Sequence, residues 1–160
     1  MDLALKTISM EAIPAAIAKA ELYRVLNEPT ETESICRDIL AVDPPNQAAT
    51  RLLAAALADQ FTGSETDAYN EAERLLHNLT DQYEQRYYGG LIRERRAKAE
   101  LAAGHAPYMV TALLREALQL FEQAEALRPA GNDEAILRWN RCVRLIRSRP
   151  ELEWSTRDTR

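Results

Sequence analysis

Residues 35–44 read Ile-Cys-Arg-Asp-Ile-Leu-Ala-Val-Asp-Pro, and residues 120–129 read Leu-Phe-Glu-Gln-Ala-Glu-Ala-Leu-Arg-Pro. In both stretches the apolar side chains recur every three or four residues, which is the spacing of one face of an α-helix. Both stretches end at a proline, which lacks the amide hydrogen needed to continue a helix. The chain therefore carries the same kind of helical ending at two distant positions.

The composition extends this helical pattern to the whole chain. The 160 residues include five Gly and two Phe, and Ala and Leu, which lose little rotamer freedom in a helix, are in large excess. Helical spacing interrupted by Pro, Gly and polar turns predicts an all-α chain of about seven helices. We expect these helices at residues 11–27 (or from Pro14), 30–43, 46–60, 64–79, 82–103, 108–128 and 132–147.

Several helix starts carry capping signals. Thr30 and Ser64 each precede an acidic residue by three positions, which is the spacing of a capping box, and Asp81 and Asn132 are further candidate caps. In the first helix we expect Ile17, Ala20, Tyr23 and either Leu26 or Asn27 to form the inward stripe. The Gly89-Gly90 pair predicts a kink or a close helix contact.

Short antiparallel helix pairs bury only one face each, so they must stack to complete a core. Ala20 and Ala54 lie 34 residues apart, and Leu53, Ala54 and Leu57 form a large-small-large set on one helix. A fixed period of this kind is typical of repeat proteins.

These residues resemble the tetratricopeptide repeat (TPR) family, whose 34-residue helix pair ends with Pro. Cys36 and Phe121 fall at the bulky position of the family's second helix, whereas Thr32 departs from its small position. The resemblance implies a right-handed α-solenoid of three repeats with a carboxy-terminal capping helix. The implied boundaries are a lead-in at 1–12, repeats at about 13–46, 47–80 and 81–131, a capping helix at 132–147 and a polar tail at 148–160.

The charge and cysteine content bound the class of protein. There are 20 Lys and Arg against 25 Asp and Glu, a formal net charge of -5, with 46% hydrophobic residues. This balance does not suit a general nucleic-acid binder or a disordered chain. Cys36 and Cys142 lack the spacing of a disulfide framework or a zinc site, and no apolar run is long enough to span a membrane. We therefore expect a soluble cytoplasmic protein.

The sequence contains no motif that predicts catalysis, a metal or a cofactor. His77 lies near a helix end and His105 lies in a turn, and neither has Cys or carboxylate neighbours at ligand spacing. We expect no catalytic residue, no metal site, no cofactor and no enzyme activity. An enzyme with an unrecognised site is the alternative from another class.

The distribution of arginines is the one sequence feature that suggests a function. In the resembling family the first helices of successive repeats line a concave groove that receives a partner segment. The resemblance places seven residues there, and we expect them to bind a protein or peptide partner with an acidic segment. They are Glu21, Arg24, Arg51, Arg93, Arg96, Arg141 and Arg144. The alternative is a solvated face on which the arginines pair with Glu94, Glu100 and their neighbours.

Other interaction roles stay open at this point. Leu152 and Trp154 in the tail could dock on a second copy, which would make the chain a self-associating scaffold. The length and acidity also resemble secretion-type chaperones of three repeats. Nucleic-acid binding through the arginine-rich second half is the weaker alternative, because the chain is acidic overall.

Overall fold

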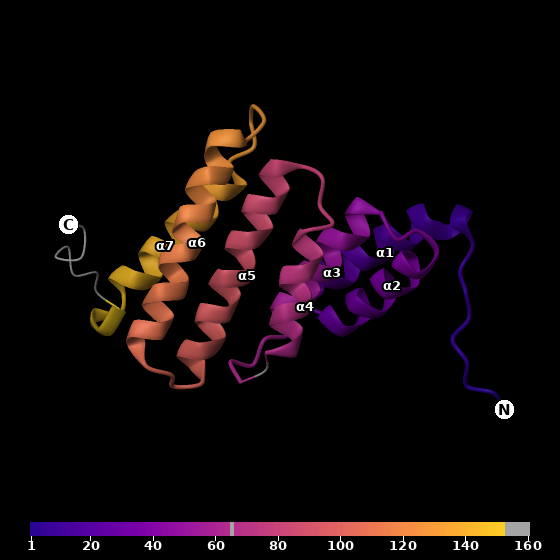
Figure 1. Ribbon diagram of the computed structural model, residues 1–160, viewed down its shortest axis with the longest axis horizontal. Helices are drawn as coiled ribbons and strands as arrows, with labels where there is room; N and C mark the ends of the chain where they lie inside the picture. Colours follow the sequence, from indigo (N-terminus) through magenta and orange to yellow (C-terminus); the bar gives the residue numbers. More distant parts are fainter. Residues whose placement is uncertain (65, 153–160) are drawn as a thin grey trace.

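The computed structural model describes residues 1–64 and 66–152, and this part of the chain is all-helical with no strand (Figure 1). Its seven α-helices agree in number with the sequence prediction. They are α1 (Ile13–Val25), α2 (Pro29–Val42), α3 (Gln47–Asp59), α4 (Asp67–Leu76), α5 (Gln82–Ala102), α6 (Pro107–Leu127) and α7 (Glu134–Arg147). Short 3-10 turns at Met10–Ala12 (η1) and Pro150–Leu152 (η2) flank them.

Polar side chains cap two of these helices, and a third polar side chain binds a free amide at the start of α7. The side chain of Asn46 accepts a hydrogen bond from Ala49 N at 2.9 Å, and that of Asp81 accepts one from Tyr83 N at 2.9 Å. Asn132 Oδ1 accepts one from Glu134 N at 3.1 Å, but the cap residue of α7 is Asp133 and not Asn132 as the sequence predicted. Each bond satisfies an amide that has no partner inside its helix.

Two of the predicted caps are wrong. Helix α2 begins at Pro29, one residue before Thr30, and helix α4 begins at Asp67, after Ser64; neither start has a side-chain cap. Proline is favoured in the first helical turn because its missing amide hydrogen is not needed there. Pro29 therefore starts α2 and leaves Thr30 inside the first turn, where it cannot act as the cap.

Consecutive helices pack against each other along the chain, and the odd-numbered helices also contact one another. Helix α3 contacts α1 and α5, and α5 contacts α7. Buried side chains form three clusters, one around Ile13 and Ile39, one around Ala20 and Ala54, and one around Phe121 and Cys142. The core is therefore distributed along the row of helices.

Small residues set the closest approaches between helices. Ala20 and Ala54 are both fully buried in one cluster, and the hydroxyl of Thr32 donates a hydrogen bond to the Ala20 carbonyl at 2.9 Å. A Cβ atom on Gly90 would lie 2.6 Å from Phe121 Cε1. The glycine pair thus permits the close contact that its sequence predicted, between α5 and α6.

The two ends of the row differ. At the carboxy-terminal end Leu152 folds back and is fully buried against α6 and α7. Its burial removes Leu152 from the surface that a second copy could reach, and Trp154 lies outside the described residues. At the other end, the sequence predicted that either Leu26 or Asn27 would lie on the inward stripe of α1. This prediction is wrong, because both residues are exposed.

Candidate functional site

Helices α1, α3, α5 and α7 carry three groups of ion pairs, centred on Asp59, Glu84 and Glu94, which we call together the ion-pair network. We call the surface formed by these side chains the odd-helix face. Asp59 of α3 links Arg24 of α1 (3.2 Å) to Arg95 of α5 (3.5 Å). Arg51 of α3 donates two hydrogen bonds to Glu84 of α5, the shorter at 2.9 Å. These contacts cross from helix to helix, so they align the odd-numbered helices as well as carrying charge.

Glu94 is the centre of the network at the α5–α7 end. Its side chain is fully buried and is contacted by Lys98 of α5 and by two arginines of α7. Arg138 Nη1 lies 3.7 Å from Glu94 Oε2, and Arg141 Nε lies 3.7 Å from Glu94 Oε1. Three cations therefore surround one carboxylate, and a buried charge needs such partners because it has lost its contact with water.

The cations around Glu94 differ in their exposure. The side chain of Arg141 is 63% exposed, and it donates no hydrogen bond within the described residues. Lys98 is more enclosed, and burial lowers its pKa, an effect that the nearby positive charges of Arg141 and Arg95 reinforce. Arg141 is thus held near Glu94 while its guanidinium stays accessible to a partner.

Tyrosines of α5 lie between the charged groups. The hydroxyl of Tyr87 donates a hydrogen bond to Glu134 of α7 at 3.4 Å, and its ring meets that of Tyr88 edge to face at a centroid distance of 5.1 Å. Burial raises the pKa of Tyr88. The Tyr88 phenol therefore stays protonated near neutral pH and adds a hydrogen-bonding group without adding charge.

The structure gathers only some of the seven residues expected in the groove. Arg24, Arg51 and Arg141 lie in the odd-helix network. Glu21 and Arg144 are exposed on α1 and α7, and neither side chain has a hydrogen bond or ion pair within residues 1–64 and 66–152.

Arg93 and Arg96 lie elsewhere, because they point from α5 toward the even-numbered helices. Arg93 pairs with Glu73 of α4 at 2.7 Å and with Glu116 of α6 at 2.9 Å. Arg96 stacks over the Tyr69 ring of α4 at 4.0 Å and pairs with its own helix neighbour Glu100. Arg95, which faces α3, differs from both because successive residues turn by about 100° around a helix.

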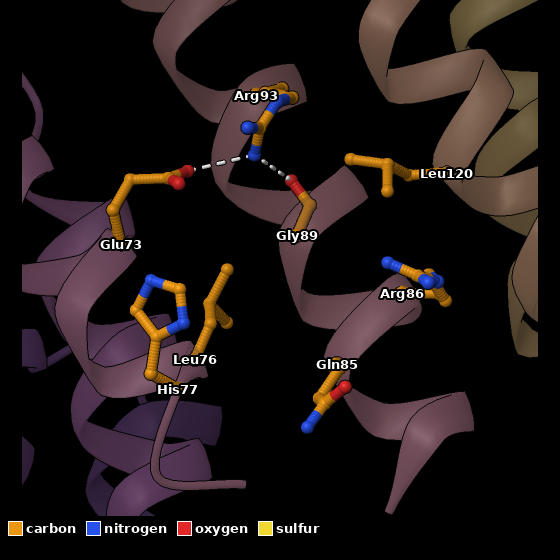
Figure 2. A pocket seen from close by; sticks show the side chains of 8 residues that line it. All are labelled: Glu73, Leu76, His77, Gln85, Arg86, Gly89, Arg93 and Leu120. Carbon is orange, nitrogen blue, oxygen red and sulfur yellow. Dashed lines mark hydrogen bonds and ion pairs between the residues drawn. The ribbon is translucent and has the colours of Figure 1, made fainter.

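A pocket of about 230 Å³ opens between α4, α5 and α6 on this other side (Figure 2). Figure 2 shows Arg93 joined to Glu73 and to the Gly89 carbonyl, with His77 on the α4 side of the pocket. His77 is exposed, and its imidazole has no hydrogen bond or ion pair within the described chain.

The described residues contain no group of three or more His, Cys, Asp or Glu that could hold a metal ion. The two thiols, Cys36 and Cys142, are free and buried, and burial raises the pKa of each to about 12. Thiols of this kind are poor nucleophiles because little thiolate forms near neutral pH. No described helix is long and apolar enough to cross a membrane.

Sequence reasoning missed the central role of Glu94 and its partners Lys98 and Arg138. Glu94 had been considered only as a surface partner of the arginines. The four-residue spacing of Glu94 and Lys98 is visible in the sequence, but that spacing is also common on exposed helices. Their burial depends on α7, which follows some forty residues later.

Comparisons with known proteins find no matching family model, curated protein or solved structure. The observed class is an all-helical chain of packed neighbouring helices with a charged odd-helix face.

Proposed function

We propose that the chain is a stack of TPR-like helix pairs that acts as a non-catalytic protein-interaction module. Three pairs, α1–α2, α3–α4 and α5–α6, followed by the single helix α7 are consistent with three repeats and a cap. The contacts among odd-numbered helices and the division of the core into three clusters support this arrangement. The cytoplasmic location stays a prediction from the sequence.

The binding surface in this proposal is the odd-helix face, and its partner is an acidic segment of another protein. The observation that carries the proposal is the charge of the ion-pair network. It joins six cations to three carboxylates, a net charge of +3 in a chain whose overall charge is -5. If Glu134, which accepts a hydrogen bond from Tyr87, is also counted, the net charge of this surface is +2.

This excess concentrates at the α5–α7 end. Among the described residues, Lys98, Arg138 and Arg141 share only Glu94 as a carboxylate within hydrogen-bonding or ion-pairing distance. A carboxylate from a partner would gain charge-assisted hydrogen bonds from guanidinium groups already held in place, which limits the entropy lost on binding. Arg93 and Arg96 are not part of the proposed surface because they face α4 and α6.

The test uses a fluorescein-labelled peptide rich in Glu and Asp, with a Lys-rich peptide of the same length as the control ligand. Fluorescence anisotropy should show binding of the acidic peptide that weakens as salt rises. Arg141→Ala should weaken it about tenfold, as expected for losing one charge-assisted hydrogen bond. Arg147→Ala, an exposed change at the end of the same helix, should leave the affinity within about twofold.

Two results would contradict the proposal. One is equal binding of acidic and basic peptides, and the other is an Arg141→Ala protein with unchanged affinity for the acidic peptide. A single-stranded RNA that binds more tightly than the acidic peptide would instead favour the nucleic-acid alternative.

A further inference from the structure

Helix α1 is apolar on two opposite faces. Its inner face contains Ile13 and Ala20, which are buried against α2 and α3. Its outer face contains Leu22, Val25 and Leu26, which are 55%, 83% and 59% exposed. Val25 and Leu26 each neighbour Leu22 on the helix surface because they follow it by three and four residues. We call these three residues the α1 stripe.

Helix α1 is not apolar all round, since Lys19 and Glu21 are exposed between these two faces, but an apolar stripe on a helix normally faces a neighbouring element. Repeat stacks need polar outer faces on their terminal helices to stay in solution. Helix α7 meets this need, because Arg141, Arg144 and Arg147 are exposed at the opposite end of the row. Helix α1 does not, so the α1 stripe is the surface that a further element is expected to cover.

The chain segment before α1 has the same character. Residues 1–7 run away from the helices as an isolated extended trace (Figure 1), and Leu3 and Leu5 are 87% and 94% exposed. We call residues 1–7 the arm. Ile8 anchors its base by packing against the cluster of Ile13, Ile39 and Ala49, which lies on the inner side of α1. The arm therefore leaves the molecule away from its own α1 stripe.

We propose that a second copy of this chain covers the α1 stripe, in a two-fold dimer in which each arm lies over the stripe of the other copy. An extended chain advances at most about 3.3–3.6 Å per residue, so seven residues reach roughly 23–25 Å. Helix α1 has 13 residues and is therefore about 20 Å long. One arm is long enough to follow the whole of a neighbouring α1.

The apolar area fits such a dimer. An exposed Leu or Val offers roughly 100 Å² of apolar surface, so the stripe together with Leu3 and Leu5 exposes on the order of 400 Å² in each copy. A standard interface buries about 800 Å² per partner, a little more than half of it apolar. The apolar component of a stable interface is thus present at this end.

The charges at this end also permit pairing of identical surfaces. Residues 1–28 contain three cations and four carboxylates, so this part is nearly neutral although the chain carries -5. Two copies therefore meet without strong repulsion. A two-fold interface uses the same patch on both partners and closes at two copies, which suits a chain that supplies both an arm and a stripe.

The mass in solution tests the proposal directly. Sedimentation of the full chain, from low micromolar to submillimolar concentration, should show a species of twice the 18.1 kDa of one chain. Leu22→Glu combined with Val25→Glu should give the single-chain mass with an unchanged far-ultraviolet circular dichroism spectrum. Leu137→Glu, at a 61% exposed apolar position on α7, is the matched control and should stay dimeric.

A cross-link tests the placement of the arm. A Leu3→Cys chain mixed with a Val25→Cys chain should form a disulfide between two chains under mild oxidation, because the native Cys36 and Cys142 are buried. A single-chain mass for the unaltered protein at every concentration would overturn the proposal. So would a dimer that survives the double substitution, or a mixture of Leu3→Cys and Val25→Cys chains in which no disulfide joins the two. This test is independent of acidic-peptide binding, since the α1 stripe lies outside the ion-pair network.

Discussion

Single residues with small side chains set the spacing between neighbouring helices. Ala20, Ala54 and Gly90 lie where helices approach most closely, and all three are fully or almost fully buried. The sequence indicated these positions through their repeat spacing and through the unusual glycine pair. It did not indicate Glu94, because a buried carboxylate and an exposed one have the same helical spacing from their lysine partner.

The two neighbouring glycines of α5 provide a matched test of this close packing. A Cβ on Gly90 would meet the ring of the fully buried Phe121 at 2.6 Å, whereas one on Gly89 would meet the end of the Leu120 side chain at 3.3 Å. We expect Gly90→Ala to lower the free energy of unfolding by about 1–2 kcal/mol, because overpacking exceeds the gain of about 1 kcal/mol in helix propensity. Urea denaturation measures the change.

Gly89→Ala is the control for the same helix. Leu120 can move, so the gain in helix propensity should leave this variant at least as stable as the unaltered chain. Equal stabilities for the two variants would contradict a tight contact between Gly90 and Phe121.

At the scale of helices, the boundaries followed from local rules. Asp81 could be predicted as a cap because its side chain bonds to the Tyr83 amide two residues away, whereas the Asn46 cap was not predicted and Asp133, not Asn132, is the cap residue of α7. The predicted cap at Thr30 is wrong because α2 already begins at Pro29. Leu26 was a candidate for the inward stripe because it is apolar, but α1 turns that position away from α2 and α3.

One ion pair joins two helices that the chain order separates, and it predicts a pH dependence. Arg37 of α2 donates hydrogen bonds to Glu71 of α4, the shorter at 2.7 Å, and these bonds lower the pKa of Glu71 from its ordinary value of 4.5. The folded chain therefore binds this proton less readily than the unfolded chain. Its contribution to stability is present above the unfolded-state pKa and is lost as the pH falls through the folded-state pKa.

We expect the free energy of unfolding of the Glu71→Gln variant to fall less steeply with decreasing pH. Between about pH 6 and pH 3 the unaltered chain should lose up to about 1 kcal/mol more unfolding free energy than the variant, a small effect because both side chains are partly exposed. Urea titrations at several pH values measure it. Glu31→Gln, on the exposed first turn of α2, should keep the original profile, and identical profiles for all three proteins would rule out the effect.

At the scale of the whole molecule, the two ends of the row are finished differently. Leu152 closes the carboxy-terminal end against α6 and α7, whereas α1 leaves an apolar face uncovered. Because the core is divided into clusters along the row, a change at one end should act mainly on the nearest helices.

Leu152→Ala tests this local character. Removing a fully buried leucine should lower the free energy of unfolding by about 2–4 kcal/mol. Hydrogen exchange should show a larger loss of protection in α6 and α7 than in α1 and α2. Leu137→Ala, at an exposed position, should change stability by no more than about 0.5 kcal/mol, and a uniform loss of protection after Leu152→Ala would argue for one undivided core.

Helix content, the number of helices and most of their ends could be derived from the amino-acid order, because propensity, proline position and capping act over a few residues. Three features could not be derived in this way. They are the pairing of Glu94 with Arg138 and Arg141, the separation of Arg93 and Arg96 from Arg24 and Arg51, and the exposure of the α1 stripe. These features depend on which helix lies against which. Helical periodicity shows that a side chain shares a face with others, but the burial of that face is settled by contacts between segments far apart in the chain.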